Sequence, residues 1–161
     1  MTTDEGMRVI LVQTKALADT KVLAQEAMPY ELGGILVGWW EDDNVAVVQA
    51  LLPVPDQHAG RAHYERKHSL AQQTLDEHLR AGGGSSSGYI GEWHSHPAPQ
   101  PPSSIDRGVL SDIVKQERRR AVLLVLALNN AGVVDVHGLV GCPRWPRRAA
   151  IERATIERIE S

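Results

Sequence analysis

Residues 119–141 constrain the fold of this chain more than any other segment. Their sequence, RRAVLLVLALNNAGVVDVHGLVG, holds two apolar, β-branched runs separated by Asn-Asn-Ala-Gly. Each run has the length and composition of a strand, and the short turn between them predicts an antiparallel hairpin. The chain should therefore contain a sheet that is not built by strict alternation of parallel strands and helices.

The remaining segments alternate between strand-like and helix-like patterns. Apolar runs predict strands at 7–13, 32–40, 45–54 and 89–96, with a short strand near 62–64. Helices are expected from Thr14, Ser69 and Ser103, with Thr14 as the N-cap of the first. The charged segment 143–161, with isoleucines roughly on one side, predicts a C-terminal helix.

This order of elements predicts an α+β (mixed α/β) fold. Strands joined by hairpins and flanked by helices indicate a central mixed β-sheet with helices packed against it. A length of 161 residues suits one domain with a substantial core. We expect a single domain over 1–161, with its core at about 7–140.

Composition excludes several classes of protein. The net charge of −3 and the pI near 6.1 argue against a nucleic-acid-binding protein. No apolar run approaches the roughly 20 residues that span a bilayer, and no export signal is visible. The single cysteine, Cys142, cannot form an internal disulfide, which suits a reducing compartment. We therefore expect a cytoplasmic protein that binds neither nucleic acid nor membrane.

The stretch GEWHSHPAPQPPSSID, residues 91–106, carries the clearest chemical signal. Side chains two apart on a strand point to the same face, so His94 and His96 can bind one ion. Pro97 ends the strand, and Asp106 in the first turn of the next helix can supply a third ligand. Two imidazoles and one carboxylate leave the fourth position of a tetrahedral zinc open to water, as in catalytic sites.

The same stretch has a second interpretation that requires no metal. Ser103-Ser104-Ile105-Asp106 is an S-x-x-D sequence, in which Ser103 would be the N-cap and Asp106 its partner three residues later. The two interpretations compete for the Asp106 carboxylate, and the residues of this stretch alone leave both of them open.

Two separated motifs resemble those of the JAMM, or MPN+, zinc metallopeptidases. HSHPAPQPPSSID resembles the family signature of His-x-His-Pro, a short spacer and Ser-x-x-Asp. YELGGILVG, residues 30–38, resembles the family segment in which a glutamate precedes an apolar strand. The order of elements over residues 7–140 also matches that of the family. The resemblance implies a cytidine-deaminase-like MPN/JAMM domain, and the compact chain is most similar to the prokaryotic branch.

The resemblance also implies a role for each site residue. His94, His96 and Asp106 would hold one Zn²⁺ per chain, and Glu31 would be the general base for a metal-activated water. Ser103 would donate a hydrogen bond to the oxyanion. Two departures from the family pattern are present: the spacer between His96 and Asp106 is one residue short, and Gly33 replaces a cysteine common among relatives.

Two neighbours of the histidines bear on these assignments. Glu92 shares strand parity with His94 and His96, so local geometry makes it a second choice of base, whereas the resemblance favours Glu31. Ser95 has the opposite parity, and we expect it to point into the fold and bond backbone near the site.

The function implied by the resemblance is that of a zinc-dependent (iso)peptidase. Its substrate would be the amide bond after the Gly-Gly-type C-terminal tail of a ubiquitin-like or sulfur-carrier-like protein, as in deubiquitinase-like enzymes. Partners would include E1-like and E2-like proteins of the same system, some of which serve antiphage defence in bacteria. The alternatives are a non-catalytic MPN scaffold and a JAMM hydrolase that acts on another amide.

Two basic runs stand outside these motifs. KQERRR at 115–120 and RWPRR at 144–148 are interpreted as solvated faces, with docking of an acidic partner as the alternative.

Overall fold

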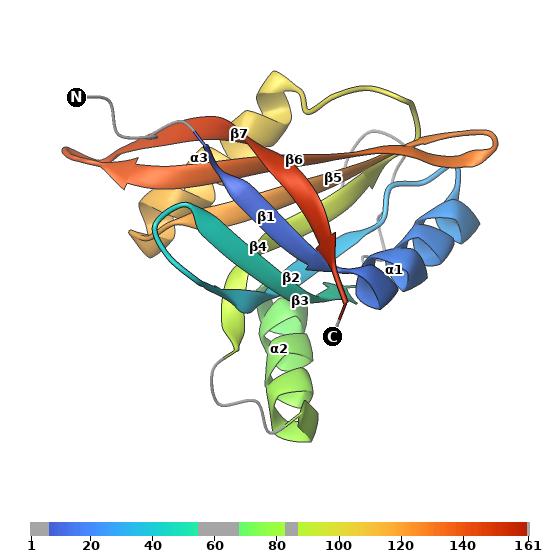
Figure 1. The fold of residues 1–161 in the computed structure, drawn as a ribbon, viewed down its shortest axis with the longest axis horizontal. Coiled ribbons are helices and arrows are strands. Elements are labelled where there is room, and N and C mark those ends of the chain that lie inside the picture. Colours follow the sequence, from blue (N-terminus) through green and yellow to red (C-terminus); the bar gives the residue numbers. More distant parts are fainter. Residues whose placement is uncertain (1–6, 55–67, 83–86, 161) are drawn as a thin grey trace.

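The computed structural model of the chain describes residues 7–54, 68–82 and 87–160 (Figure 1). Its elements follow the predicted order, apart from the last: β1 Val9–Gln13, α1 Thr14–Ala27, β2 Gly33–Trp40, β3 Val45–Pro53, α2 His68–Gly82, β4 Gly88–His96, α3 Ser104–Glu117, β5 Ala121–Asn129, β6 Gly132–Arg144 and β7 Arg148–Ile159. A mixed α/β fold with a central sheet is therefore confirmed. The strand expected near 62–64 lies outside the described residues.

The sheet closes on itself. Its strands follow the order β1-β3-β2-β4-β5-β6-β7, and β7 pairs with β1 to complete a barrel. The β1–β3, β1–β7 and β4–β5 pairs are parallel, and the other four are antiparallel. The predicted hairpin is the β5–β6 pair. No helix in the described part of the chain is long and apolar enough to cross a bilayer.

Strand β5 lies between the two largest apolar clusters. One set of alternate residues, which includes Val122, Leu124 and Leu126, faces the central cluster inside the sheet. The intervening Leu123 and Val125 pack with residues of α3 in a second cluster. Burial on both faces explains why this strand is apolar throughout. It also fixes α3 on the outer face of the sheet beside β5 and β6 (Figure 1).

The predicted helix at 143–161 is wrong, because most of this segment is strand β7. A helix would spread Ile151, Ile156 and Ile159 over an arc of about 140°, whereas in a strand the odd spacing of Ile151 and Ile156 places them on opposite faces. Ile151 packs with the α3 cluster, and Ile156 packs with the central cluster. The edges of β6 and β1 supply backbone partners on both sides of β7. Tertiary pairing has thus overridden the local helical pattern.

The predicted capping role of Thr14 is also wrong. The N-cap of α1 is Gln13, with no side-chain capping bond. The Thr14 hydroxyl instead donates to the carbonyl oxygen of Ile159 over 3.2 Å. This acceptor belongs to the end of β7, so it exists only because β7 closes the sheet beside β1.

Gly91 occupies a position in β4 that no other residue can take without strain. Its φ is +155°, and a Cβ there would lie 1.9 Å from the carbonyl oxygen of Val122 in β5. We expect Gly91→Ala to lower the free energy of unfolding by more than about 2 kcal/mol. Urea denaturation followed by circular dichroism measures the change.

Gly108 provides the matched control. It lies in α3 with nothing within 4 Å of an added Cβ. Gly108→Ala should therefore leave stability unchanged or raise it by up to about 1 kcal/mol, since alanine is the better helix former. Equal effects of the two substitutions would contradict the assigned geometry of β4.

Candidate metal centre

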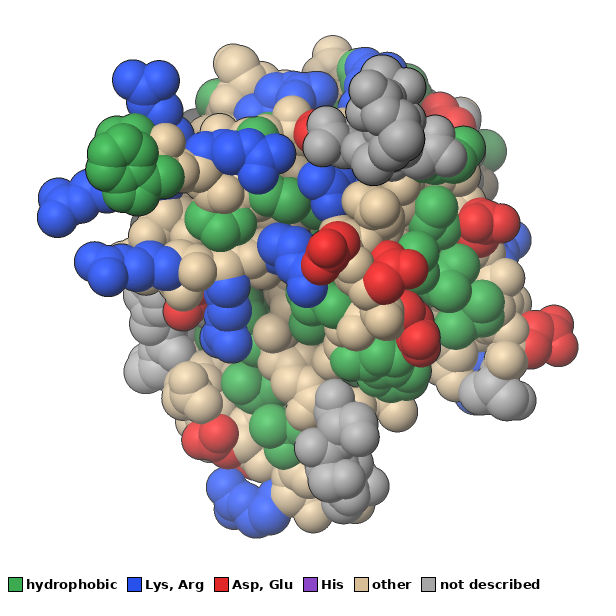
Figure 2. Space-filling model, turned by 60° about the vertical axis from the view of Figure 1, so that its left-hand side comes forward, with side chains coloured by type: hydrophobic (Ala, Val, Ile, Leu, Met, Phe, Trp, Pro, Cys, Tyr) green, Lys and Arg blue, Asp and Glu red, His purple; other side chains and the backbone are tan. Residues whose placement is uncertain are grey.

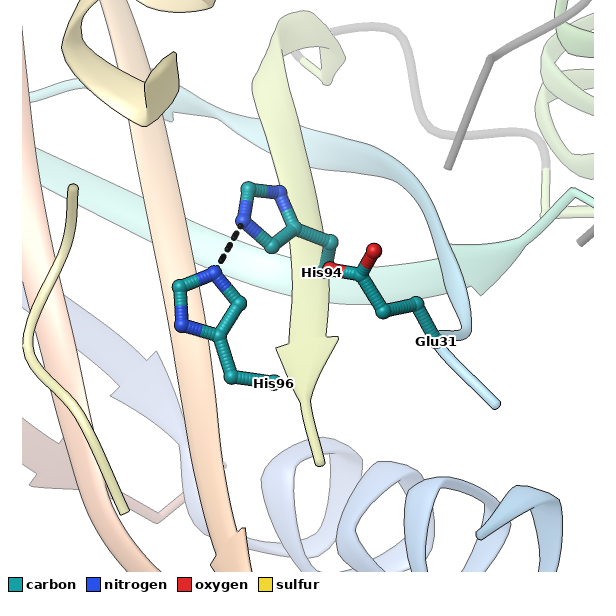
Figure 3. Close-up of side chains that lie close together, drawn as sticks. All are labelled: Glu31, His94 and His96. Atoms are coloured by element: carbon teal, nitrogen blue, oxygen red, sulfur yellow. Dashed lines mark hydrogen bonds between the residues drawn. The ribbon is translucent and has the colours of Figure 1, made fainter. Parts of the chain in front are cut away.

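Strand β4 presents His94 and His96 on the face that α3 covers. In the parallel register with β5, His94 lies beside Val125, which packs against α3, while Trp93 lies beside Leu124 of the central cluster. The expected shared face of the two histidines is therefore present. Their Nε2 atoms are 3.2 Å apart, and a dashed line joins the two rings in Figure 3.

Asp106 reaches both imidazoles from the first turn of α3. Its Oδ1 lies 2.8 Å from Nε2 of His94, and its Oδ2 lies 3.3 Å from Nε2 of His96. The carboxylate is buried. The predicted third member of the group is thus beside the histidines, although the proline-rich spacer is one residue short.

Asp106 also completes a capping box with Ser103. Its Oδ2 accepts hydrogen bonds from the Ser103 backbone N–H over 2.6 Å and from the Ser103 hydroxyl over 3.0 Å. The Asp106 N–H in turn donates to the Ser103 hydroxyl over 3.3 Å. The carboxylate has two oxygens, so the cap and a contact to an imidazole are present together. Oδ2 serves the cap while Oδ1 faces His94.

Glu31 also lies close to the histidine pair. A carboxylate oxygen of Glu31 and one nitrogen from each of His94 and His96 all lie within 4.8 Å of one another. Glu31 comes from the segment between α1 and β2, and its carboxylate points toward His94 (Figure 3). Two buried carboxylates, from Glu31 and Asp106, therefore lie close to the two imidazoles.

Ser95 ties the Glu31 segment to β4. The Ser95 N–H donates to the carbonyl oxygen of Leu32 over 2.8 Å. The Leu32 N–H donates to the Ser95 hydroxyl over 2.9 Å, and that hydroxyl lies 3.3 Å from the Leu32 carbonyl oxygen. Ser95 is 1% exposed, so the expectation that it points inward and bonds backbone is confirmed. These hydrogen bonds fix the backbone position of Leu32, the residue that follows Glu31.

Glu92 lies on the same face of β4 but in a different setting. Its Oε2 accepts a hydrogen bond from the hydroxyl of Tyr89 over 3.3 Å. Of the two glutamates, Glu31 is the one whose carboxylate is grouped with the two histidines. Strand parity identified Glu92 as a candidate base, but it could not show that Glu31 is the glutamate beside the histidines. The sequence carried no signal for Tyr89, because its contact depends on an irregular register around Gly91.

The electrostatics of the site keep Asp106 ionised. Burial alone would raise the pKa of Asp106, but hydrogen bonds from His94 and His96 outweigh it and hold that pKa well below its usual range. For His96, the hydrogen bond to Asp106 raises the pKa of the imidazole against the opposing effect of burial. The carboxylate is therefore an anion, ready to pair with a cation.

The donor atoms fit a zinc ion in type and in spacing. In a tetrahedral site with bonds of about 2.0–2.1 Å, neighbouring donor atoms lie roughly 3.3 Å apart. The Nε2 atoms of His94 and His96 are 3.2 Å apart, and the Asp106 carboxylate lies 2.8 Å from His94 through Oδ1 and 3.3 Å from His96 through Oδ2. Two imidazole nitrogens and one carboxylate oxygen would leave one position of a zinc tetrahedron for another ligand.

Comparison with known proteins gives three findings. Residues 14–137 match a family described as "Prokaryotic homologs of the JAB domain". A protein of Sinorhizobium fredii (strain NBRC 101917 / NGR234), "Probable metalloprotease y4qB", is 32% identical over 136 residues, which cover 81% of this chain and 79% of that protein. The solution structure of protein DSY2949 from Desulfitobacterium hafniense has a TM-score of 0.65 and 21% identity, with 94% of each chain covered. The last similarity concerns the fold.

Substitution of Asp106 and of Ser103 separates the ligand role from the capping role. We expect Asp106→Asn to weaken zinc binding by more than about 100-fold, since the anionic donor is lost. Ser103→Ala should lower stability by about 0.5–2 kcal/mol through loss of the cap but retain zinc. Zinc titration and thermal unfolding with and without zinc measure both effects. Full zinc affinity in Asp106→Asn would show that Asp106 serves only the cap.

Removal of the Ser95 hydroxyl tests the connection between β4 and the Glu31 segment. Ser95→Ala leaves the Leu32 N–H without its acceptor, so we expect a loss of about 1–3 kcal/mol in the free energy of unfolding. Ser104→Ala, at an exposed serine, is the control and should change stability by less than about 0.5 kcal/mol. Similar values for both variants in urea denaturation would refute the structural role of Ser95.

Proposed function

Because the chain belongs to the family of prokaryotic homologs of the JAB domain, we propose that it is a zinc-dependent peptidase or isopeptidase. The observation that carries this proposal is the pair of buried carboxylates, Glu31 and Asp106, that lie close to His94 and His96. The name of the Sinorhizobium relative supports a metalloprotease activity. The fold is proposed to be of the cytidine-deaminase-like MPN type.

The proposed zinc ligands are His94, His96 and Asp106. Zinc held by them would supply a Lewis acid for the substrate carbonyl and would lower the pKa of water toward neutrality. The capping box orients Asp106, because bonds from Ser103 hold Oδ2 while Oδ1 faces His94. One ligand is thus positioned by the start of a helix rather than by a mobile loop.

Glu31 is the proposed general base. Its carboxylate lies beside the imidazole nitrogens of His94 and His96, within reach of a water in the site. It would accept a proton from that water and return it to the leaving amine nitrogen, so that one group serves as base and then acid. The bonds between Ser95 and Leu32 would hold Glu31 in place for both transfers.

Ser103 is the proposed donor to the oxyanion. It is exposed, so a substrate can reach its hydroxyl. That hydroxyl now donates to Asp106 Oδ2 over 3.0 Å, and it would have to rotate toward the substrate to stabilise developing negative charge. The backbone N–H of Ser103 would keep the other half of the cap intact during this rotation.

The proposed substrate is an amide bond that follows the Gly-Gly-type tail of a ubiquitin-like or sulfur-carrier-like protein. Its support is the resemblance of residues 30–38 and 94–106 to the JAMM motifs. A system of this kind would supply E1-like and E2-like proteins as further partners. The alternatives of a non-catalytic scaffold and of another amide substrate have no structural observation of their own in favour.

Glu31→Gln tests the proposed mechanism. The substitution keeps the size of the side chain but removes the base, so we expect zinc content to stay near that of the unchanged protein. Cleavage should fall by about 10²–10⁴-fold. The measurement is hydrolysis of a fluorogenic amide placed after the Gly-Gly tail of a ubiquitin-like protein, together with metal analysis.

Glu92→Gln is the matched control. It makes the same chemical change at a glutamate two residues before His94 on β4. It should retain most of the cleavage activity, since Glu92 contacts Tyr89 rather than the histidine cluster. Loss of activity in Glu92→Gln with full activity in Glu31→Gln would assign the base to Glu92. Zinc bound without cleavage of any such amide would remove the proposed substrate.

A further inference from the structure

The two basic runs of the sequence meet at one hollow. The hollow has a volume of about 410 Å³ and lies between the end of α3 and the turn from β6 to β7. Its charged and aromatic lining, here called the basic hollow, consists of Lys115, Arg118, Arg144, Trp145, Arg147 and Arg148. Figure 2 shows Lys and Arg side chains gathered around an exposed apolar side chain at one end of the molecule.

The basic hollow is separate from the metal centre. Helix α3 carries Asp106 in its first turn and ends beside Arg118. At a rise of 1.5 Å per residue, these two positions lie roughly 18 Å apart along the helix axis. The chemistry proposed for the histidine cluster therefore does not explain the residues of the hollow.

The positive charge of the basic hollow is not balanced from within the described chain. None of its five cations forms an ion pair with a carboxylate in the parts that the structure describes. The neighbouring Arg120 differs, because its guanidinium lies 4.2 Å from the ring centre of Trp40 and donates to the carbonyl oxygen of Asp42 over 2.9 Å. In a chain of net charge −3, this cluster is a local exception that suits an anionic partner.

Two of the arginines sit in unfavourable backbone conformations. Arg118 has a φ of 55° and Arg147 a φ of 54°, and within the described residues they are the non-glycine residues with positive φ. Arg118 is the C-cap of α3, a left-handed position that glycine favours. Arginine therefore occupies both positions against the preference of the backbone. Strain held in this way points to a role for the side chain.

Trp145 supplies an apolar surface among these charges. Its side chain is 94% exposed, the highest value among the large hydrophobic residues described. Tryptophan and arginine are the residues most enriched among those that carry the binding energy of protein interfaces. A partner with carboxylates around an apolar side chain would be complementary in both charge and shape.

We propose that the basic hollow docks an acidic segment of a partner protein. Its arginines pair with carboxylates through two parallel hydrogen bonds each, and Trp145 covers an apolar side chain of the segment. This docking does not depend on hydrolysis at the metal centre. A protein segment is favoured over nucleic acid because the rest of the chain is acidic and would repel a long polyanion.

Binding of a defined acidic peptide tests the proposal. The probe is a fluorescein-labelled peptide of twelve residues, rich in Glu and Asp with one central Leu, followed by fluorescence polarisation. The test variant is Arg118→Gly with Arg147→Gly, which removes two charges and relieves the backbone. We expect peptide affinity to fall at least 10-fold while the melting temperature stays equal or rises. Trp145→Ala should also weaken binding without loss of stability.

The control variant also loses two positive charges, but at positions outside the basic hollow. Lys15→Gln with Arg80→Gln alters exposed cations on α1 and α2, away from α3, and should bind the peptide like the unchanged protein. Docking should also persist in Glu31→Gln, which separates this inference from the proposed catalysis.

Three results would overturn the proposal. One is failure of the unchanged protein to bind the peptide, and another is equal binding by the Arg118 and Arg147 double variant. The third is tighter binding of a labelled twelve-residue oligothymidylate than of the peptide, with loss in the same double variant, because this would assign the hollow to nucleic acid.

Discussion

The position of β4 between β2 and β5 is the constraint on which the candidate metal centre depends. Its antiparallel pairing with β2 places Leu32 and Gly33 beside the histidine strand, and so brings Glu31 to the imidazoles. Its parallel pairing with β5 requires a crossover, because two parallel neighbours cannot be joined by a tight turn. Helix α3 is that crossover, and its first turn follows the end of β4. Backbone pairing therefore brings together the Glu31 segment, the end of β4 and the first turn of α3.

Asp106 shows how one residue can serve structure and chemistry together. Its Oδ2 accepts the capping bonds from Ser103, while its Oδ1 lies 2.8 Å from His94. The cap orients the carboxylate, and the imidazoles keep it ionised despite its burial. The site is thus supported by bonds that also begin a helix. This arrangement places a charged side chain in a buried position without leaving it unsatisfied.

Helix α3 connects the two surfaces that this chain offers. Its first turn belongs to the metal centre, and its last turn belongs to the basic hollow. Closure of the sheet by β7 completes the second surface, because the turn that precedes β7 carries Trp145 and Arg147. A partner held at that turn would lie one helix length from the histidines. The fold therefore allows the proposed docking at the basic hollow and the proposed hydrolysis at the histidines to take place at opposite ends of α3.

The sequence by itself determined the features that depend on local periodicity. The shared face of His94 and His96 follows from the two-residue repeat of a strand, and Ser103 as the N-cap of α3 follows from a capping pattern. Only the resemblance singled out Glu31, since strand parity favoured Glu92. Tertiary structure decided which segments pair: residues 148–159 became β7 because β6 and β1 each offered an unpaired edge. Contacts of this kind join residues far apart in the chain, and local patterns carry no record of them.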